Sequence, residues 1–175
     1  MILIIGYLGA VTAALFTAYA IQKMAPKKWG AGLFSVLPKV WEYIEKVGRD
    51  VEENKKSWGY FKNSWESYLE LRGLTNGTSE PKFPVTYNIP ERDAFYKSVS
   101  YAGWDGSSGH DAPMIAYDAL MMAKDSWFQI CSCSMFHGGD SDSTRILAAA
   151  WWGGTYDMKG VHLGNYRNWN MVLGL

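Results

Sequence analysis

The chain has 175 residues, enough for one domain with a buried core, and 15% of them are aromatic. This share of rings excludes a disordered chain. Lys plus Arg and Asp plus Glu number 17 each, and no basic block occurs, so the chain lacks the charge that recruits nucleic acid or an acidic membrane surface. The two cysteines, Cys131 and Cys133, are too few for a disulfide framework or a structural zinc site. We therefore expect reduced thiols and a cytoplasmic protein.

The first 22 residues carry no charged side chain, which is the length of a membrane span. Ala18-Tyr19-Ala20 also has the form of a signal-peptidase site. Against both, Gly, Thr and Tyr dilute the apolar run, and no Lys or Arg precedes it. We favour a helix that is apolar on all sides because it lies buried in a helical protein, ahead of a signal peptide and then a membrane span.

Two longer runs show the spacing of amphipathic helices. In residues 29–47 apolar side chains recur every three or four positions, with Pro38 predicting a kink or a division and Gly48 the end. Residues 51–72 form the second run, which Gly73 ends. The aromatic stripe of this run predicts core packing: Trp58, Phe61, Trp65, Tyr68.

Turn residues separate the remaining elements. We expect a loop over 73–90, a helix over 91–100, a glycine loop over 101–110, a helix from Pro113 to Ala123, and a last helix from near Asp142 or Ser143 to Gly153–Gly154. Asp111 is placed to cap the helix that Pro113 begins. No run alternates as a strand does, so the predicted fold class is all-α.

The stretch FHGGDSDST, residues 136–144, concentrates oxygen ligands at the start of the last helix. Asp140, Asp142 and Ser143 can direct carboxylate and hydroxyl oxygens to one point, which selects a hard cation such as magnesium, manganese or calcium. The alternative is helix capping, for which Asp and Ser are equally suited. A third match, the D-x-D-x-T nucleophile loop of a phosphatase, should follow a hydrophobic strand early in the chain, and this context does not.

Five segments together resemble the ADP-ribosylglycohydrolase family, and within it most the ADP-ribosylarginine hydrolases. They are GYLGAVTAALFTAYAI (6–21), WGAGLFSVLP (29–38), SWGYFKNSWESYLELRG (57–73), SYAGWDGSSGHDAPMIAYDAL (100–120) and FHGGDSDST (136–144). The resemblance covers residues 6–169, whereas 1–5 and 170–175 diverge.

The resemblance implies a compact orthogonal all-α fold in which residues 6–21 are a buried helix. It implies hydrolysis of the N-glycosidic bond between ADP-ribose and an arginine of a protein, at a site with two Mg²⁺ ions. Asp140, Asp142 and Ser143 would be metal ligands, and Asp140 or Asp142 would polarise the attacking water. The residues that would line the ADP-ribose pocket are Tyr101, Gly106, Ser107, Ser108, Gly109 and His110. Neither a nucleic-acid nor a membrane partner is implied, and the family is expected to be monomeric.

This chain also departs from the family pattern. The family places a second acidic string, of Ser/Thr-Asp-Asp-Thr type, in the N-terminal part of the domain, and no such string occurs here. We therefore expect residues 1–175 to be the C-terminal portion of a single domain, holding one Mg²⁺ ion or none. Arg145 stands where the family has a small residue, so it either repels a metal, pairs with Asp142 or points to solvent.

The missing string leaves three functions open for this chain alone. It is an arginine-specific hydrolase, a non-catalytic module that binds ADP-ribose or a partner, or a fragment that does not fold alone. An incomplete domain also leaves an apolar face uncovered, which predicts association with another chain.

Overall fold

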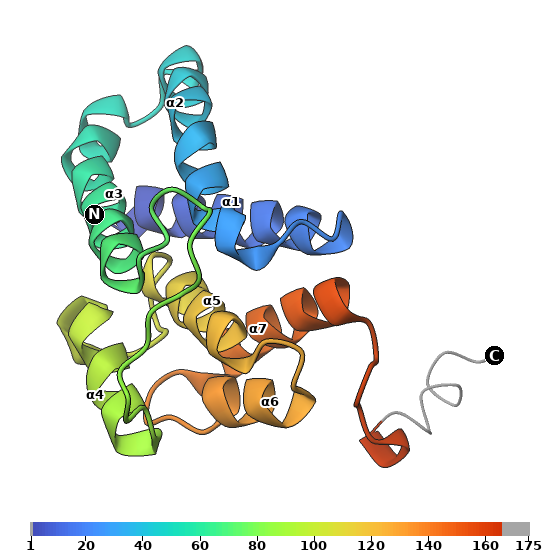
Figure 1. The fold of residues 1–175 in the computed structure, drawn as a ribbon. Coiled ribbons are helices and arrows are strands. Elements are labelled where there is room, and N and C mark those ends of the chain that lie inside the picture. Colours follow the sequence, from blue (N-terminus) through green and yellow to red (C-terminus); the bar gives the residue numbers. More distant parts are fainter. Residues whose placement is uncertain (1, 166–175) are drawn as a thin grey trace.

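The computed structural model describes residues 2–165 and is helical, with no strand in that range, as the sequence predicts. The α-helices are α1 (Ile2–Ile21), α2 (Trp29–Val47), α3 (Val51–Arg72), α4 (Ile89–Val99), α5 (Asp111–Ala123), α6 (Trp127–Met135) and α7 (Ser141–Tyr156). Three short 3-10 helices are η1 (Pro26–Lys28), η2 (Tyr101–Gly103) and η3 (Leu163–Asn165). Helices α5, α6 and α7 pack on one another, and α1 lies between this group and the α2–α3 pair (Figure 1).

Helix α1 is a core helix, but it is covered on one side only. At the centre of the core, the ring of its Phe16 contacts four rings at centroid distances of 5.2–5.7 Å, those of Trp29, Trp65, Tyr117 and Trp151. The opposite side exposes Gly6, Tyr7, Ala10 and Ala14. Helix α1 is thus buried on one side, as the interpretation as a core helix predicts, and its other side is the kind of uncovered apolar face expected of an incomplete domain. Residues Ile4–Ile21 are long and apolar enough to cross a membrane, with a mean hydropathy of 1.8, and 39% of them are buried in this fold.

Helix ends mostly follow the predicted signals. Gly48 and Gly73 end α2 and α3 in the left-handed conformation, both with φ of 69°. Pro38 does not divide α2, which runs unbroken through it. Helix α4 begins at Ile89, earlier than expected, because Asn88 and Glu91 form a capping box.

Two expectations about the last third of the chain are wrong. Helix α6, whose first turn is capped by the Ser126 side chain, was not predicted from the sequence. Helix α7 also continues through the two glycines expected to end it. A Cβ on Gly154 would lie only 2.9 Å from the Cβ of Ala20, so this glycine allows α7 to approach α1 closely.

The loop 73–88 is held to the core by a group that we call the Asp118 network: Tyr68, Arg72, Tyr87 and Asp118. The Asp118 carboxylate accepts hydrogen bonds from Arg72 Nε at 2.7 Å, from the Tyr68 hydroxyl at 3.0 Å and from the Tyr87 hydroxyl at 2.7 Å. Arg72 also donates to the Tyr87 hydroxyl. Because all four residues are buried, these bonds fix the loop against α3 and α5.

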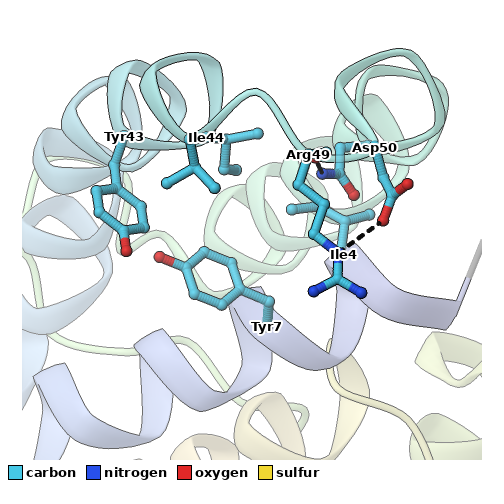
Figure 2. Close-up of a pocket in the computed structure, with 8 residues that line it drawn as sticks. Ile4, Tyr7, Tyr43, Ile44, Arg49 and Asp50 are labelled. Atoms are coloured by element: carbon cyan, nitrogen blue, oxygen red, sulfur yellow. Dashed lines mark hydrogen bonds and ion pairs between the residues drawn. The ribbon is translucent and has the colours of Figure 1, made fainter.

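A shallow hollow of about 290 Å³ lies where the start of α1 meets the end of α2 and the start of α3. Figure 2 shows the rings of Tyr7 and Tyr43 side by side in it, with Arg49 paired to Asp50 at 3.5 Å. Its lining contains no residue of the glycine loop, 101–110, or of residues 136–144, which we call the oxygen-rich string.

Candidate functional site

The oxygen-rich string forms the start of α7, and Asp140 is its N-cap residue. The Asp140 carboxylate accepts hydrogen bonds from the backbone amide of Ser143 at 3.4 Å and from the Ser143 hydroxyl at 3.0 Å. Helix capping and a shared cation site are therefore compatible at Asp140, because the capping geometry itself brings the side-chain oxygens of Asp140 and Ser143 together.

Asp142 lies in the first turn of α7 and is exposed. Its interaction with the Asp140 carboxyl lowers its pKa, as do the backbone amides of Asp142 and Ser143 and the charge of Arg145. The two carboxylates thus lie close enough to interact, beside the Ser143 hydroxyl. Arg145 is itself exposed.

Thr144 and His137 support the string from inside the protein. The buried Thr144 hydroxyl lies 2.8 Å from His137 Nε2 and donates to the Ser134 carbonyl at 3.0 Å. The amide of Gly139 donates to His137 Nδ1 at 3.2 Å. In a neutral imidazole these bonds place the proton on Nε2. Burial lowers the pKa of His137, which favours this neutral form.

The glycine loop, residues 101–110, touches the string directly. The Asp140 amide donates to the Asp105 carbonyl at 2.7 Å. Gly106 has a φ of +80°, and a Cβ added to it would lie 2.7 Å from Thr144 Cγ2 and 3.0 Å from the Asp140 carbonyl oxygen. On the other side, a Cβ on Gly139 would lie 2.3 Å from the Asp105 carbonyl oxygen. Glycine at both positions therefore allows the two segments to meet backbone to backbone.

Asp111 braces the loop instead of capping α5, so the expected capping role is wrong. Its buried carboxylate accepts from the amide of Tyr101 at 3.0 Å and from the amide of Ser108 at 2.8 Å. The bonds join the two ends of the loop because Tyr101 and Ser108 lie at its start and near its close. Helix α5 begins at Asp111 itself, with His110 as N-cap residue.

The end of the glycine loop packs against α1 at Gly109, and its last residue, His110, contacts the Ser108 side chain. A Cβ on Gly109 would lie 2.2 Å from the Ile5 carbonyl oxygen, so only glycine fits at this crossing. The buried His110 lies with Nδ1 2.6 Å from the Ser108 hydroxyl and Nε2 3.2 Å from the Val99 carbonyl. Since a carbonyl only accepts, Nε2 carries the proton and Nδ1 accepts from Ser108. Burial lowers the pKa of His110 despite the nearby Asp111, so the imidazole is neutral.

The expected pocket residues thus differ in what they present. Tyr101 and Ser107 are exposed, and the Ser107 hydroxyl donates to the Trp104 carbonyl at 2.8 Å. Ser108 is half-buried and His110 fully so, which makes His110 a support for Ser108 in this structure. Gly106 and Gly109 set the course of the backbone, one against the string and one against α1.

Asp105 is the residue of this region that the sequence analysis did not select. Its side chain is 1% exposed, and neither carboxylate oxygen has a hydrogen-bond partner. The sequence shows an aspartate between Trp104 and Gly106, within the glycine loop. Its burial and its lack of a hydrogen-bond partner cannot be recognised from the sequence.

The donors at this corner fit the class of cation expected from the sequence. Asp140, Asp142 and Ser143 offer only oxygen, and Asp105, whose backbone carbonyl binds the Asp140 amide, carries a further carboxylate that has no hydrogen-bond partner. Within residues 2–165, however, no three His, Cys, Asp or Glu side chains lie close enough together to hold an ion by themselves. A cation here would need hydroxyl, water or further ligands.

Comparison with known proteins agrees with this description. Residues 5–167 match the family model for ADP-ribosylglycohydrolase. The chain is 43% identical over 179 aligned positions to ADP-ribosylhydrolase ARH1 of Dictyostelium discoideum, covering 93% of this chain and 46% of that protein. It is 30% identical to protein L444 of Acanthamoeba polyphaga mimivirus, whose name provisionally makes it an ADP-ribosyl glycohydrolase, covering 87% of this chain and 30% of the viral protein. The chain thus spans less than half the length of either relative, and it belongs to the ADP-ribosylglycohydrolase family.

Proposed function

We propose that this chain carries part of the active site of a magnesium-dependent hydrolase that cleaves the N-glycosidic bond between ADP-ribose and arginine in proteins. The observation that carries the proposal is the direct contact between the glycine loop and the string, through the 2.7 Å hydrogen bond from Asp140 to Asp105. Family membership and the similarity to an ADP-ribosylhydrolase support glycosyl hydrolysis. The arginine linkage rests on the sequence resemblance described above.

The oxygens of Asp140, Asp142 and Ser143 would hold a Mg²⁺ ion, which when bound supplies a Lewis acid for the ribose hydroxyls and the attacking water. The lowered pKa of Asp142 keeps its carboxylate ionised and able to accept a proton or a hydrogen bond from water. Cleavage at an anomeric carbon develops positive charge on the sugar, which the same carboxylates stabilise.

The loop binds and orients the rest of the substrate in this proposal. Tyr101 offers an exposed ring, which meets Tyr60 edge to face. His110 fixes the Ser108 hydroxyl, whose proton is committed to Nδ1, so Ser108 faces a ligand as an acceptor. Since Asp111 holds both ends of the loop, this arrangement exists before any ligand binds.

Hydrolysis of ADP-ribosyl-arginine with Mg²⁺ tests the proposal directly. Asp140→Ala should lower turnover on the order of a hundredfold or more, because it removes a cation ligand and the N-cap together. Asp125→Ala is the matched control, since Asp125 is an exposed aspartate paired only with Lys159. Turnover that survives Asp140→Ala would rule out the string as the site.

A non-catalytic module that binds ADP-ribose is the second candidate. Two findings favour it. Asp111 holds the two ends of the glycine loop by hydrogen bonds, and within residues 2–165 no three His, Cys, Asp or Glu side chains lie close enough together to hold a metal ion. Titration calorimetry with ADP-ribose separates the two functions. Binding of ADP-ribose together with no release of arginine from the substrate would support this second function.

A further inference from the structure

The carboxylate of Asp105 stands apart from the other buried groups near the string. Both of its oxygens are buried, and no donor within the described part of the chain reaches either one. Burying an ionised carboxylate without hydrogen bonds is costly, and buried polar groups in folded proteins nearly always have a partner. The missing partner therefore calls for an explanation by function.

No polar neighbour of Asp105 donates a hydrogen bond to it within residues 2–165. His137 is close enough to feel the charges of Asp105, Asp93, Asp140 and Arg92. Its two ring nitrogens, however, bond Gly139 and Thr144. Arg92 Nη2 donates to the Ser132 carbonyl at 3.0 Å. Arg92 Nε is buried and lacks a partner, but it makes no hydrogen bond to Asp105, so within residues 2–165 both carboxylate oxygens of Asp105 are free to accept from a ligand.

The position of Asp105 points to what that partner is. The residue lies between the glycine loop and the string: its carbonyl accepts from the Asp140 amide, and its Cβ is 2.4 Å from where a Cβ on Gly139 would be. Two further carboxylates, those of Asp140 and Asp142, begin α7 on the other side of that bond. Three negative side chains at one corner attract a cation, not an anion or an apolar group.

We propose that Asp105 is a further carboxylate of this cation site and accepts hydrogen bonds from water bound to the ion. The inference rests on the proposed function, because it requires that Asp140, Asp142 and Ser143 bind a divalent cation. A role through water follows because no three acidic or imidazole side chains among residues 2–165 converge closely enough to ligate an ion directly. Carboxylates of this kind orient ligated water and raise the affinity for the metal.

The test compares Asp105→Asn with the wild-type chain in two measurements. The first is the melting temperature without metal, which should rise because the change removes an unpaired buried charge. The second is the affinity for Mn²⁺, followed by the loss of the free-ion electron paramagnetic resonance signal and by competition with Mg²⁺. We expect that affinity to fall about 10–100-fold. A merely structural role for Asp105 predicts a lower melting temperature, so the two measurements together are diagnostic.

Asp93→Asn is the matched control. Asp93 is a second acidic residue beside His137 and also has one buried oxygen without a partner, but it lies on α4 next to Gly138 and not against Asp140. It should leave the affinity for Mn²⁺ within about twofold, because Asp93 belongs to α4 and no hydrogen bond joins it to Asp140 in the described part of the chain. Equal losses in both variants would mean that general electrostatic attraction is at work, and would overturn the proposal.

The remaining outcomes separate this inference from the proposed function. If the wild-type chain binds no Mn²⁺ or Mg²⁺ at millimolar concentration, the cation site fails and this inference fails with it. If the wild-type chain binds and Asp105→Asn binds equally well, only the role of Asp105 fails. Asp105→Ala, which keeps the same backbone bond to Asp140, replaces Asp105→Asn if that variant lacks the near-ultraviolet dichroism of the folded chain.

Discussion

Asp118 and Asp105 are both buried aspartates, with side chains 0% and 1% exposed, but their surroundings are opposite. Asp118 accepts three hydrogen bonds, one of them from a guanidinium, and ties a long loop to the core. Asp105 accepts none on its carboxylate and lies at the junction of the two segments that the family resemblance singled out. Burial alone therefore does not distinguish the two aspartates, whereas the number of hydrogen bonds that each carboxylate accepts does.

The electrostatics of the two regions follow the same division. Burial and the nearby Asp118 raise the pKa of Tyr68 and of Tyr87, so both remain donors at neutral pH. Burial alone would lower the pKa of Arg72, but the Asp118 carboxylate raises it. The charges of the Asp118 network are thus paired within the network, whereas the carboxylate of Asp105 has no hydrogen-bond partner among the described residues.

The largest expected loss of stability is at the Asp118 network. Asp118→Asn leaves the buried charge of Arg72 without its counter-ion, and removing one partner of a buried pair costs about 3–5 kcal/mol. That is a large part of the stability of an ordinary domain. Urea unfolding followed by tryptophan fluorescence measures the loss. Glu80→Gln, which opens the exposed pair of Glu80 with Lys27, is the control and should change little. If Asp118→Asn were as mild as the control, Asp118 would not be the structural member of the comparison.

The junction of loop and string should respond to a single added methyl group. Gly106→Ala combines a left-handed φ with contacts of 2.7 Å to Thr144 and 3.0 Å to Asp140, and should cost about 2–4 kcal/mol and weaken cation binding. Gly103→Ala is the matched control, because Gly103 also has a positive φ, +73°, but a Cβ there meets nothing within 4 Å. It should cost only about 1 kcal/mol. Similar unfolding midpoints for the two variants would show that the close contact contributes nothing.

The same comparison explains how far the sequence could lead. Periodicity placed α2 and α3, and glycines marked where both end, because these signals are local. Helix α6 was missed because its nine residues, WFQICSCSM, carry no charged stripe to set off an apolar face. Gly154 was misread because the close approach of α7 to α1 requires a glycine there, and Pro38 was misread because α2 continues through it.

The candidate site was predictable only in part, for a related reason. The string and the loop were visible as residue types, but their contact depends on how the 34 residues between Asp105 and Asp140 fold back, which no local pattern specifies. Asp111 is an example: its position two residues before Pro113 suggested a cap, whereas its carboxylate accepts hydrogen bonds from the amides of Tyr101 and Ser108. The unpaired state of Asp105 is likewise a property of what fails to surround it in space.

Acidification should weaken the fold through the two buried imidazoles. His110 and His137 have pKa values lowered from 6.5 by burial, so the native state binds fewer protons than the unfolded chain below about that pH. Stability is therefore full above the unfolded value and declines as the pH falls from about 6.5 toward the lowered values. Each kcal/mol lost lowers the melting temperature by about 2–4 °C in a chain of this size. Proton resonances of each imidazole, followed by pH, should titrate below 6.5; titration above that value would mean that the nearby acids, and not burial, control these rings.

The smallest expected effect is at Arg145, an exposed residue beside the proposed cation site. Its charge helps to lower the pKa of Asp142, and the same positive charge repels a cation at that carboxylate. Arg145→Ala should therefore raise the affinity for Mn²⁺ a few-fold at low ionic strength, and by less at 0.5 M salt, because exposed charges are screened. Lys159→Ala removes an equal charge beyond the other end of α7, where it pairs with Asp125, and should leave the affinity unchanged. If Arg145→Ala weakened the binding of Mn²⁺, Arg145 would be holding Asp142 in place. The proposed cation site would then depend on an ion pair, as the Asp118 network does.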